Sequence, residues 1–176
     1  MRIISALKEE FDSADYEMIT DYSGVGKVNA AITAMEVIKK HKPEVIINVG
    51  TVGALDSSRS GLYECGIFQD RDLLGDFRPE IIITNINGYL CSTGDRFLDK
   101  TPFRGVKVEG RLEPDFVDME AFAIATVCQK YEIKFVCFKF VTDYVNEASS
   151  INWKDNIGKG NQLFREAIDD YLSNAV

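Results

Sequence analysis

Three carboxylate side chains stand beside apolar stretches of this sequence and could together carry out acid–base chemistry. Glu10 follows the run RIISAL, Glu120 precedes the stretch AFAIATV, and Asp143 ends KFVCFKFVTD. The chain has a single histidine, His41, which lies in a short basic cluster. A Ser-His-Asp triad and a metal site with several histidines are therefore excluded, and any acid–base chemistry must come from carboxylates, lysine or tyrosine.

Asp143 is the candidate for a general acid, because a nearly unbroken apolar strand delivers it at its carboxyl end. A partly buried aspartate in such a place can have a raised pKa and donate a proton. The alternative is that Asp143 caps the residues that follow it. For Glu10 the alternative is a solvated acidic turn, and for Asp118 and Glu120 it is a favourable interaction with the dipole of the helix that begins there.

The stretch SGVGKVNAA has glycines in a pattern that superficially suggests a phosphate loop. The P-loop pattern fails, because Asp21 occupies the first glycine position and Val28 stands where a hydroxyl should coordinate magnesium. The dinucleotide pattern G-x-G-x-x-G fails at Asn29. What remains is a tight turn between a strand and a helix, which either is purely structural or lets backbone N–H groups approach a ligand.

The pattern of apolar residues predicts the elements that must position these side chains. Strand-like runs alternate with helical stretches, which is typical of an α/β layer architecture with a mainly parallel sheet. In such sheets ligands bind beyond the carboxyl ends of the strands. The predicted strands cover residues 2–7, 17–24, 44–50, 80–86, 89–95 and 134–143, and the predicted helices cover 27–42, 121–131 and 161–175.

Composition limits the class of protein. A chain of 176 residues with 45% apolar residues suits one domain, residues 1–176. The net charge of −8 argues against nucleic acid as a partner. No apolar run approaches a membrane span, and the N-terminal stretch becomes acidic too soon for a signal peptide. The four cysteines lack C-x-x-C spacing, which favours reduced thiols in a cytoplasm over disulfides or a zinc site.

Six stretches occur in the order found in one known family. They are IISALKEE, SGVGKVNAA, PEVIINVGTVGAL, STGDRF, VDMEAFAIA and VTDYVN. In this order the chain resembles the 5′-methylthioadenosine/S-adenosylhomocysteine nucleosidases of the nucleoside phosphorylase superfamily, as a shortened member. The resemblance implies a three-layer α/β fold with a mixed, mainly parallel sheet flanked by helices.

The resemblance also implies roles for the residues at the bond to be broken. Asp143 would protonate N7 of a purine, and Glu10 would deprotonate the attacking water. Thr51 would help to place that water. Glu120, with Met119 beside it, would hold the ribose hydroxyls. A general acid at the base and carboxylates near the sugar address the charges that develop, without a metal or another cofactor.

The remaining implied contacts lie around the base and the 5′ end of the nucleoside. Phe97 would stack on the purine, Trp153 would form a wall for the 5′-substituent, and Val25 and Leu7 would add apolar surface. The resemblance further implies a homodimer. The stretch at residues 68–80, where relatives form the dimer contact, is shorter here than in the family.

Three activities remain open from the sequence. The first is a purine nucleoside hydrolase, which Glu10 favours because its charge would repel phosphate beneath the ribose. The second is a phosphorylase, and the third is a non-catalytic nucleoside-binding relative. Lys139 stands where the family usually has an arginine, and the two side chains are not interchangeable. Methylthioadenosine, S-adenosylhomocysteine, 5′-deoxyadenosine and a futalosine-like nucleoside all remain candidate substrates.

Overall fold

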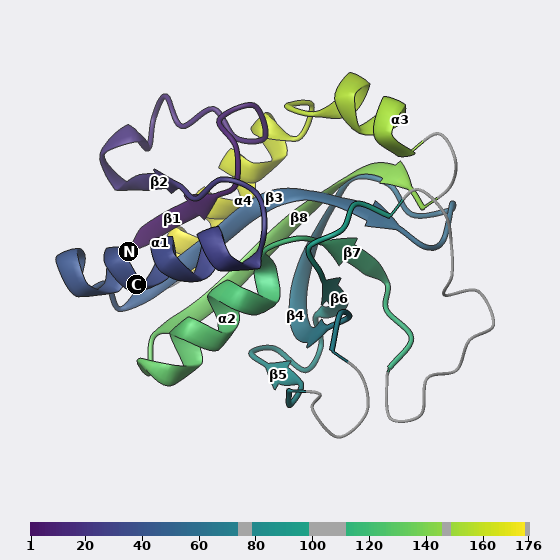
Figure 1. Cartoon of the computed structure of the whole chain (residues 1–176). Helices are drawn as coiled ribbons and strands as arrows, with labels where there is room; N and C mark the ends of the chain where they lie inside the picture. The colour runs from purple at the N-terminus through teal and green to yellow at the C-terminus, as the bar shows by residue number, and fades with distance from the viewer. Residues whose placement is uncertain (74–78, 99–111, 146–148, 175–176) are drawn as a thin grey trace.

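A mixed sheet of eight strands forms the centre of the molecule, with helices on both of its faces (Figure 1). The computed structural model describes residues 1–73, 79–98, 112–145 and 149–174. The strands are β1 (Arg2–Ser5), β2 (Thr20–Tyr22), β3 (Val45–Ala54), β4 (Leu62–Asp70), β5 (Ile82–Ile83), β6 (Tyr89–Thr93), β7 (Phe116–Asp118) and β8 (Lys134–Tyr144). The helices are a 3₁₀ turn (Glu17–Ile19), α1 (Lys27–His41), α2 (Ala121–Lys130), α3 (Ser149–Asn156) and α4 (Asn161–Asn174).

Strand pairing confirms the mixed, mainly parallel sheet. The pairs β1/β2, β1/β3, β3/β8, β4/β6 and β6/β7 are parallel, whereas β3/β7, β4/β5 and β4/β8 are antiparallel. The pairings β3–β8–β4–β6–β7–β3 close a circuit, so one half of the sheet curls onto itself. This curl brings the ends of β3, β7 and β8 together.

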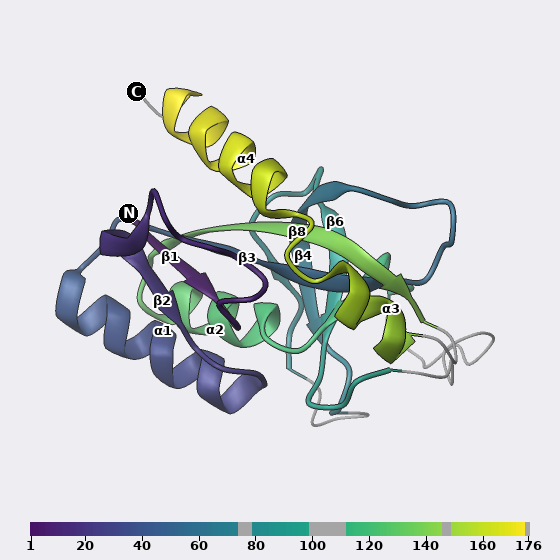
Figure 2. The same cartoon turned by 90° about the horizontal axis from the view of Figure 1, so that it is seen from above.

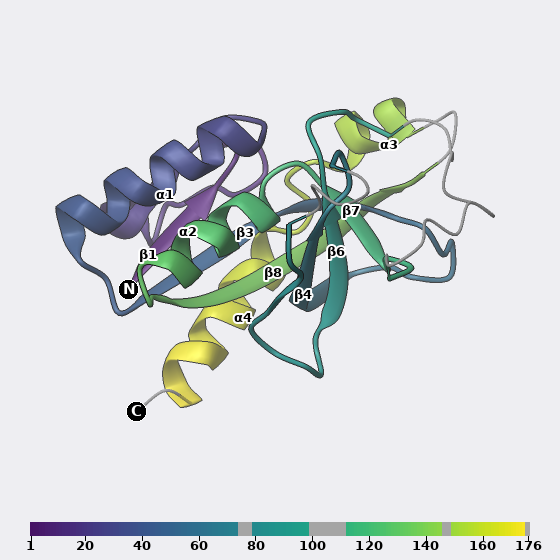
Figure 3. The same cartoon turned by 60° about the horizontal axis from the view of Figure 1, so that its bottom comes forward.

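Helices cover the two faces of the sheet and bury its apolar side chains. Helices α1 and α2 lie next to each other on one face, while α4 lies on the other (Figures 2 and 3). Adjacent residues of β3 serve the two faces: Ile46 belongs to the cluster under α1 and α2, and Ile47 to the cluster with Phe164 of α4. Both isoleucines are fully buried, which explains why this strand is continuously apolar rather than alternating.

Several predicted elements have different bounds in the structure. Residues 17–19 form a 3₁₀ turn instead of extending the second strand, and the strand expected at 80–86 is limited to Ile82–Ile83. Strand β3 continues through its glycines to Ala54, because β8 pairs with it along that whole length. Strands β4 and β7 and helix α3 were not predicted.

Helix α1 begins at the predicted Lys27 and ends one residue before the predicted end. It buries Ala30, Ala34, Val37 and Ile38. Val28, in its first turn, is 68% exposed. The helix ends at His41, and the next residue, Lys42, adopts the left-handed conformation with a φ of 46° directly before Pro43. Within the described parts of the chain, no helix has the length and apolar character needed to cross a membrane.

Candidate active site

A cavity of about 130 Å³ lies where β3, β7 and β8 end. The structure brings together every residue that the sequence analysis named for a site, because all of them line this cavity: Leu7, Glu10, Val25, Thr51, Phe97, Met119, Glu120, Asp143 and Trp153. Arg71 and Asp118 also line it and were not predicted to do so.

Glu10 lies at the cavity as a buried carboxylate that is held by backbone and hydroxyl donors. Its Oε1 accepts hydrogen bonds from the Thr51 N–H at 3.0 Å and from the Thr51 hydroxyl at 2.5 Å. Its Oε2 accepts a longer bond of 3.3 Å from the Leu7 N–H. Glu10 is only 5% exposed, so the alternative of a solvated acidic turn is wrong.

Glu120 occupies the N-cap position of α2, yet its side chain does not cap that helix. Its Oε1 instead accepts a hydrogen bond of 2.8 Å from the Gly26 N–H, at the start of α1. Burial and then the nearby charge of Asp118 raise the pKa of Glu120 from 4.5 to about 8. The carboxyl group at this side of the cavity therefore retains its proton up to the pH of the cell.

Asp118, rather than Glu120, accepts the side-chain hydrogen bond at the N-terminus of α2. It closes β7 rather than lying in the first turn of α2, and its Oδ2 accepts a hydrogen bond of 2.8 Å from the Ala121 N–H. The same oxygen lies 2.9 Å from Lys139 Nζ, and its Oδ1 accepts a bond from the Thr93 hydroxyl. The two acids that flank Met119 thus have separate structural partners.

Asp143 lies near the carboxyl end of β8, next to Gly53 of β3. It is 5% exposed, and its Oδ1 accepts a hydrogen bond of 2.9 Å from the Thr142 hydroxyl. A side chain at Gly53 would place its Cβ 3.1 Å from Asp143 Oδ2 and 3.2 Å from Val117 Cγ2. The absence of a side chain at Gly53 therefore makes room for the Asp143 carboxylate and for the adjoining part of the cavity.

Aromatic and apolar side chains form the mouth of the cavity. Phe97 and Val25 are 38% and 43% exposed. Trp153, on α3, packs against Phe97 with its ring centroid 6.2 Å away and the rings tilted by 67°. The Trp153 indole N–H also donates a hydrogen bond of 3.0 Å to the Thr51 hydroxyl.

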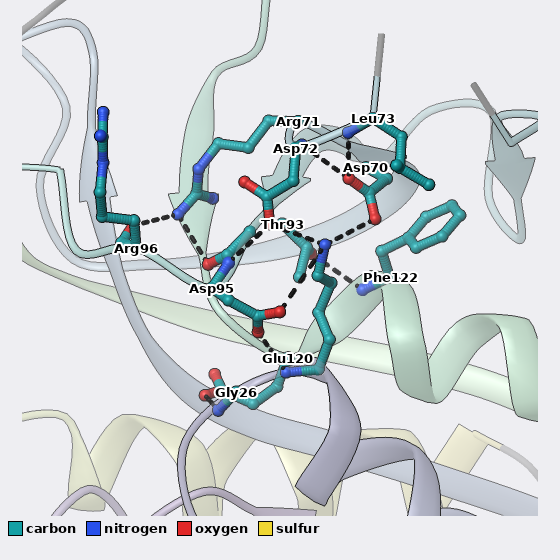
Figure 4. A network of polar contacts seen from close by, with 12 residues as sticks. Gly26, Asp70, Arg71, Asp72, Leu73, Thr93, Asp95, Arg96, Glu120 and Phe122 are labelled. Atoms are coloured by element: carbon teal, nitrogen blue, oxygen red, sulfur yellow. Dashed lines mark hydrogen bonds and ion pairs between the residues drawn. The ribbon is translucent and has the colours of Figure 1, made fainter. Parts of the chain in front are cut away.

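An ionic cluster around Lys27 ties the loops at this edge of the sheet together. Figure 4 labels its three acids, Asp70, Asp72 and Asp95. Lys27 Nζ lies 2.8 Å from Asp70 Oδ2 and 2.7 Å from Asp72 Oδ2. The Lys27 N–H donates to Asp95 Oδ1 at 2.7 Å, and the Asp95 N–H donates to Asp72 Oδ2 at 2.8 Å. The beginning of α1 is thereby joined to the loop that carries Phe97.

Arg71 fixes the same loop from inside the protein (Figure 4). Its guanidinium donates to the backbone carbonyls of Ser92, Gly94, Arg96 and Asp118. It lies in a charged stretch, QDRD, that has no periodicity from which burial could be inferred. The burial of Lys139, by contrast, can be inferred from the sequence, because a lone cation inside an apolar strand requires a buried partner.

The comparisons with known proteins agree on one family. The model described as "Phosphorylase superfamily" matches residues 14–60 and 90–173. A 5′-methylthioadenosine/S-adenosylhomocysteine nucleosidase of Staphylococcus haemolyticus is 30% identical over 173 residues, which cover 81% of this chain and 75% of that protein.

Solved structures show the same fold at lower identity. An S-adenosylhomocysteine nucleosidase of Streptococcus pyogenes, in complex with 5-methylthiotubericidin, has a TM-score of 0.79 and 18% identity, covering 98% of this chain and 95% of that one. A futalosine hydrolase of Helicobacter pylori has a TM-score of 0.77 and 16% identity, covering 90% of each chain.

An α/β protein whose mixed sheet ends in a cavity lined by acids fits the class of nucleoside-processing folds that these comparisons define. The chain belongs to the phosphorylase superfamily and, within it, to the family of the 5′-methylthioadenosine/S-adenosylhomocysteine nucleosidases.

Proposed function

We propose that this chain hydrolyses the N-glycosidic bond of a 5′-substituted adenine nucleoside, such as 5′-methylthioadenosine or S-adenosylhomocysteine, and releases adenine. The observation that carries the proposal is the convergence of Glu10, Glu120 and Asp143 on one cavity. The family relationship supports the same reaction, because the relatives are named as nucleosidases for these two compounds.

In the proposed mechanism, Asp143 gives its proton to N7 of the adenine while the bond between the base and C1′ of the ribose breaks. The electron pair of that bond leaves with the base, and positive charge develops on the ribosyl ring. Glu10 takes a proton from the attacking water, whose oxygen bonds to C1′. Glu120 holds the ribose hydroxyls. The Glu10 carboxylate near the sugar stabilises the developing positive charge, because the site is withdrawn from water.

Charge distribution favours water over phosphate as the nucleophile. Glu10 faces the cavity from the position where a phosphorylase would need a cationic partner. Among the described lining residues, Arg71 is the arginine, and four backbone carbonyls already occupy its guanidinium. Lys139 is paired with Asp118. A phosphate beneath the ribose would thus meet the Glu10 carboxylate without a free cation among these residues.

The open mouth supports a substrate with a 5′-substituent. Phe97 would stack on the base, and Trp153, Val25 and Leu7 would supply apolar surface for the substituent; all four line the cavity. The half-exposed Val25 and Phe97 leave this end accessible to longer groups than a methylthio group. A futalosine-like nucleoside therefore belongs in the substrate panel beside the two family substrates.

We further propose that residues 1–176 form one domain that works as a homodimer in a reducing cytoplasm, where release of adenine from methylthioadenosine would serve methionine salvage. Four buried, unbridged cysteines support a reducing compartment. Exposed apolar side chains around the mouth and on α1, Val25, Val28 and Ile32, support a partner surface. The shortened segment at residues 68–80 contributes Phe68–Asp70 to β4, and its residues 74–78 lie outside the described residues.

The test is adenine release from methylthioadenosine in phosphate-free buffer by the parent protein and by Asp143→Asn. We expect release by the parent and loss of nearly all activity in the variant, because an asparagine amide can donate a hydrogen bond but cannot transfer a proton to N7. Asp170→Asn, on the exposed surface of α4, is the control for loss of one carboxylate. Release that required phosphate would identify a phosphorylase instead. Binding without release under both conditions would identify a non-catalytic relative.

A further inference from the structure

We infer that Trp153 is a positioning residue for Glu10, acting through the hydroxyl of Thr51. The indole N–H lies 3.0 Å from Thr51 Oγ1, and Thr51 Oγ1 lies 2.5 Å from Glu10 Oε1. This inference rests on the proposed function, because its kinetic effect presupposes that Glu10 activates the attacking water. It goes beyond that function by giving Trp153 a task other than contact with the 5′-substituent.

The direction of this hydrogen-bond chain is fixed by the chemistry of its members. An indole N–H can only donate, and an ionised carboxylate can only accept. The Thr51 hydroxyl therefore accepts a hydrogen bond from Trp153 and uses its one hydrogen to donate a hydrogen bond to Glu10. A hydroxyl that is free to rotate could direct that proton elsewhere, whereas the indole occupies one lone pair and orients the group. Hydrogen bonds in such a chain also polarise one another, which strengthens the bond to Glu10.

The consequence for Glu10 is a difference between its two oxygens. Oε1 receives both the hydroxyl and the N–H of Thr51. Oε2 receives the Leu7 N–H at the longer distance of 3.3 Å. The anchored Oε1 fixes the orientation of the carboxylate, and Oε2 is the more basic oxygen for a water. The second lone pair of the Thr51 hydroxyl remains available to accept a hydrogen bond from the same water.

Helix α3, which carries Trp153, is bonded to the general acid as well as to the general base. The Asn156 side chain donates a hydrogen bond of 2.6 Å to the Thr142 carbonyl. The Thr142 hydroxyl in turn donates to Asp143 Oδ1 at 2.9 Å. Helix α3 is thus connected through hydrogen bonds to both Glu10 and Asp143, so its placement influences the relative position of the two acids.

The variant Trp153→Phe separates the two possible tasks of this side chain, because it removes the N–H and retains an aromatic wall. We expect kcat to fall by about three- to tenfold, the range for loss of one hydrogen bond, while KM stays within about twofold. In a Thr51→Val background, which already lacks the hydroxyl, Trp153→Phe should cause no further loss. Thr51→Ser, which keeps the hydroxyl, should remain sensitive to Trp153→Phe.

Two kinetic outcomes would overturn the inference. One is an unchanged kcat in Trp153→Phe, and the other is the same loss with and without the Thr51 hydroxyl. Melting temperatures of all variants, measured in parallel, separate a catalytic effect from incomplete folding.

A spectroscopic measurement tests the relay without any need for turnover. Trp153 is the single tryptophan of the chain, so a protein labelled with ¹⁵N gives one indole N–H signal. We expect this signal to move in Thr51→Val and in Glu10→Gln. It should stay in place in Thr126→Val, a matched change on α2 away from the cavity lining. An indole signal that ignores Thr51 contradicts the relay, whereas absence of adenine release with a responsive signal contradicts the proposed function alone.

Discussion

Asp118 and Lys139 form an ion pair beside the cavity, with Asp118 Oδ2 2.9 Å from Lys139 Nζ and both side chains almost completely withdrawn from solvent. Burial alone would raise the pKa of Asp118, but the charge of Lys139 and the hydrogen bond from Thr93 outweigh it, so the pKa is lowered. Burial would likewise lower the pKa of Lys139, and the charge of Asp118 reverses the shift. Each residue therefore keeps its charge because of the other.

We predict that Lys139→Met lowers the free energy of unfolding by about 3–5 kcal/mol, because it leaves the Asp118 carboxylate buried without its countercharge. The double variant Asp118→Asn/Lys139→Met should lose less than the sum of the two single changes, since it removes both charges together. Urea unfolding followed by circular dichroism measures all three values.

The exposed ion pair between Arg165 and Asp15 supplies the matched control for this cycle. Arg165→Met should change the unfolding free energy by less than about 1 kcal/mol, because solvent screens that pair. If Lys139→Met were as mild as Arg165→Met, the buried pair would not depend on its mutual charges.

Glu120 gives a prediction for the pH dependence of stability. Its pKa is raised from 4.5 to about 8, so the folded state holds the proton more tightly than the unfolded chain does. The stabilising contribution is therefore complete below pH 4.5 and is lost as the pH rises through about 8. Glu120→Gln stays neutral throughout and keeps an acceptor for the Gly26 N–H. The melting temperature of Glu120→Gln minus that of the parent should thus rise between pH 4.5 and about 8.

Differential scanning calorimetry of both proteins over that pH interval makes the measurement. Glu36→Gln, on the exposed face of α1, controls for the loss of one carboxylate and should show a constant difference from its parent. A constant difference for Glu120→Gln as well would mean that the buried carboxyl ionises as it does in the unfolded chain.

The cluster around Lys27 gives a prediction for substrate binding. Lys27→Met removes the cation between Asp70 and Asp72 and leaves two close carboxylates to repel each other. The contact of 3.9 Å between Lys27 Nζ and Asp95 Oδ2 is lost as well, which removes part of the support of the loop that carries Phe97. Stacking of Phe97 on the base then weakens equally in the bound substrate and in the transition state. We expect KM to rise by about threefold or more with a smaller change in kcat.

Steady-state kinetics of adenine release checks this expectation, with Lys39→Met at the exposed end of the same helix as the control. A loss confined to kcat would instead connect Lys27 to the chemical step.

The acids of the site could be found from the sequence because of where they stand along the chain. Asp143 follows a run that is apolar enough to be buried on both faces, and Glu10 follows the first such run. Parallel neighbours bring the ends of such runs to one edge of a sheet, and the structure confirms that Glu10, Glu120 and Asp143 share a cavity there. The catalytic roles assigned to them stay predictions.

The rest depended on contacts between distant parts of the chain. The strand predicted at residues 44–50 stops at the first of two glycines, yet pairing with β8 extends β3 to Ala54. Arg71 is buried by carbonyls of two later segments, and local sequence carries no trace of them. Helix α3 has no strong apolar stripe from which it could be predicted. Hydrogen bonds of Trp153 and Asn156 attach it to the sheet instead.

The four buried cysteines can be used to measure how often this fold opens. They come from four separate elements, with Cys65 on β4, Cys91 on β6, Cys128 on α2 and Cys137 on β8, and all lie in the layer between the sheet and helices α1 and α2. A thiol reagent can reach them only when that layer separates. The rate of thiol labelling under native conditions therefore reports how often the layer opens, and nucleoside binding at its edge should slow that rate.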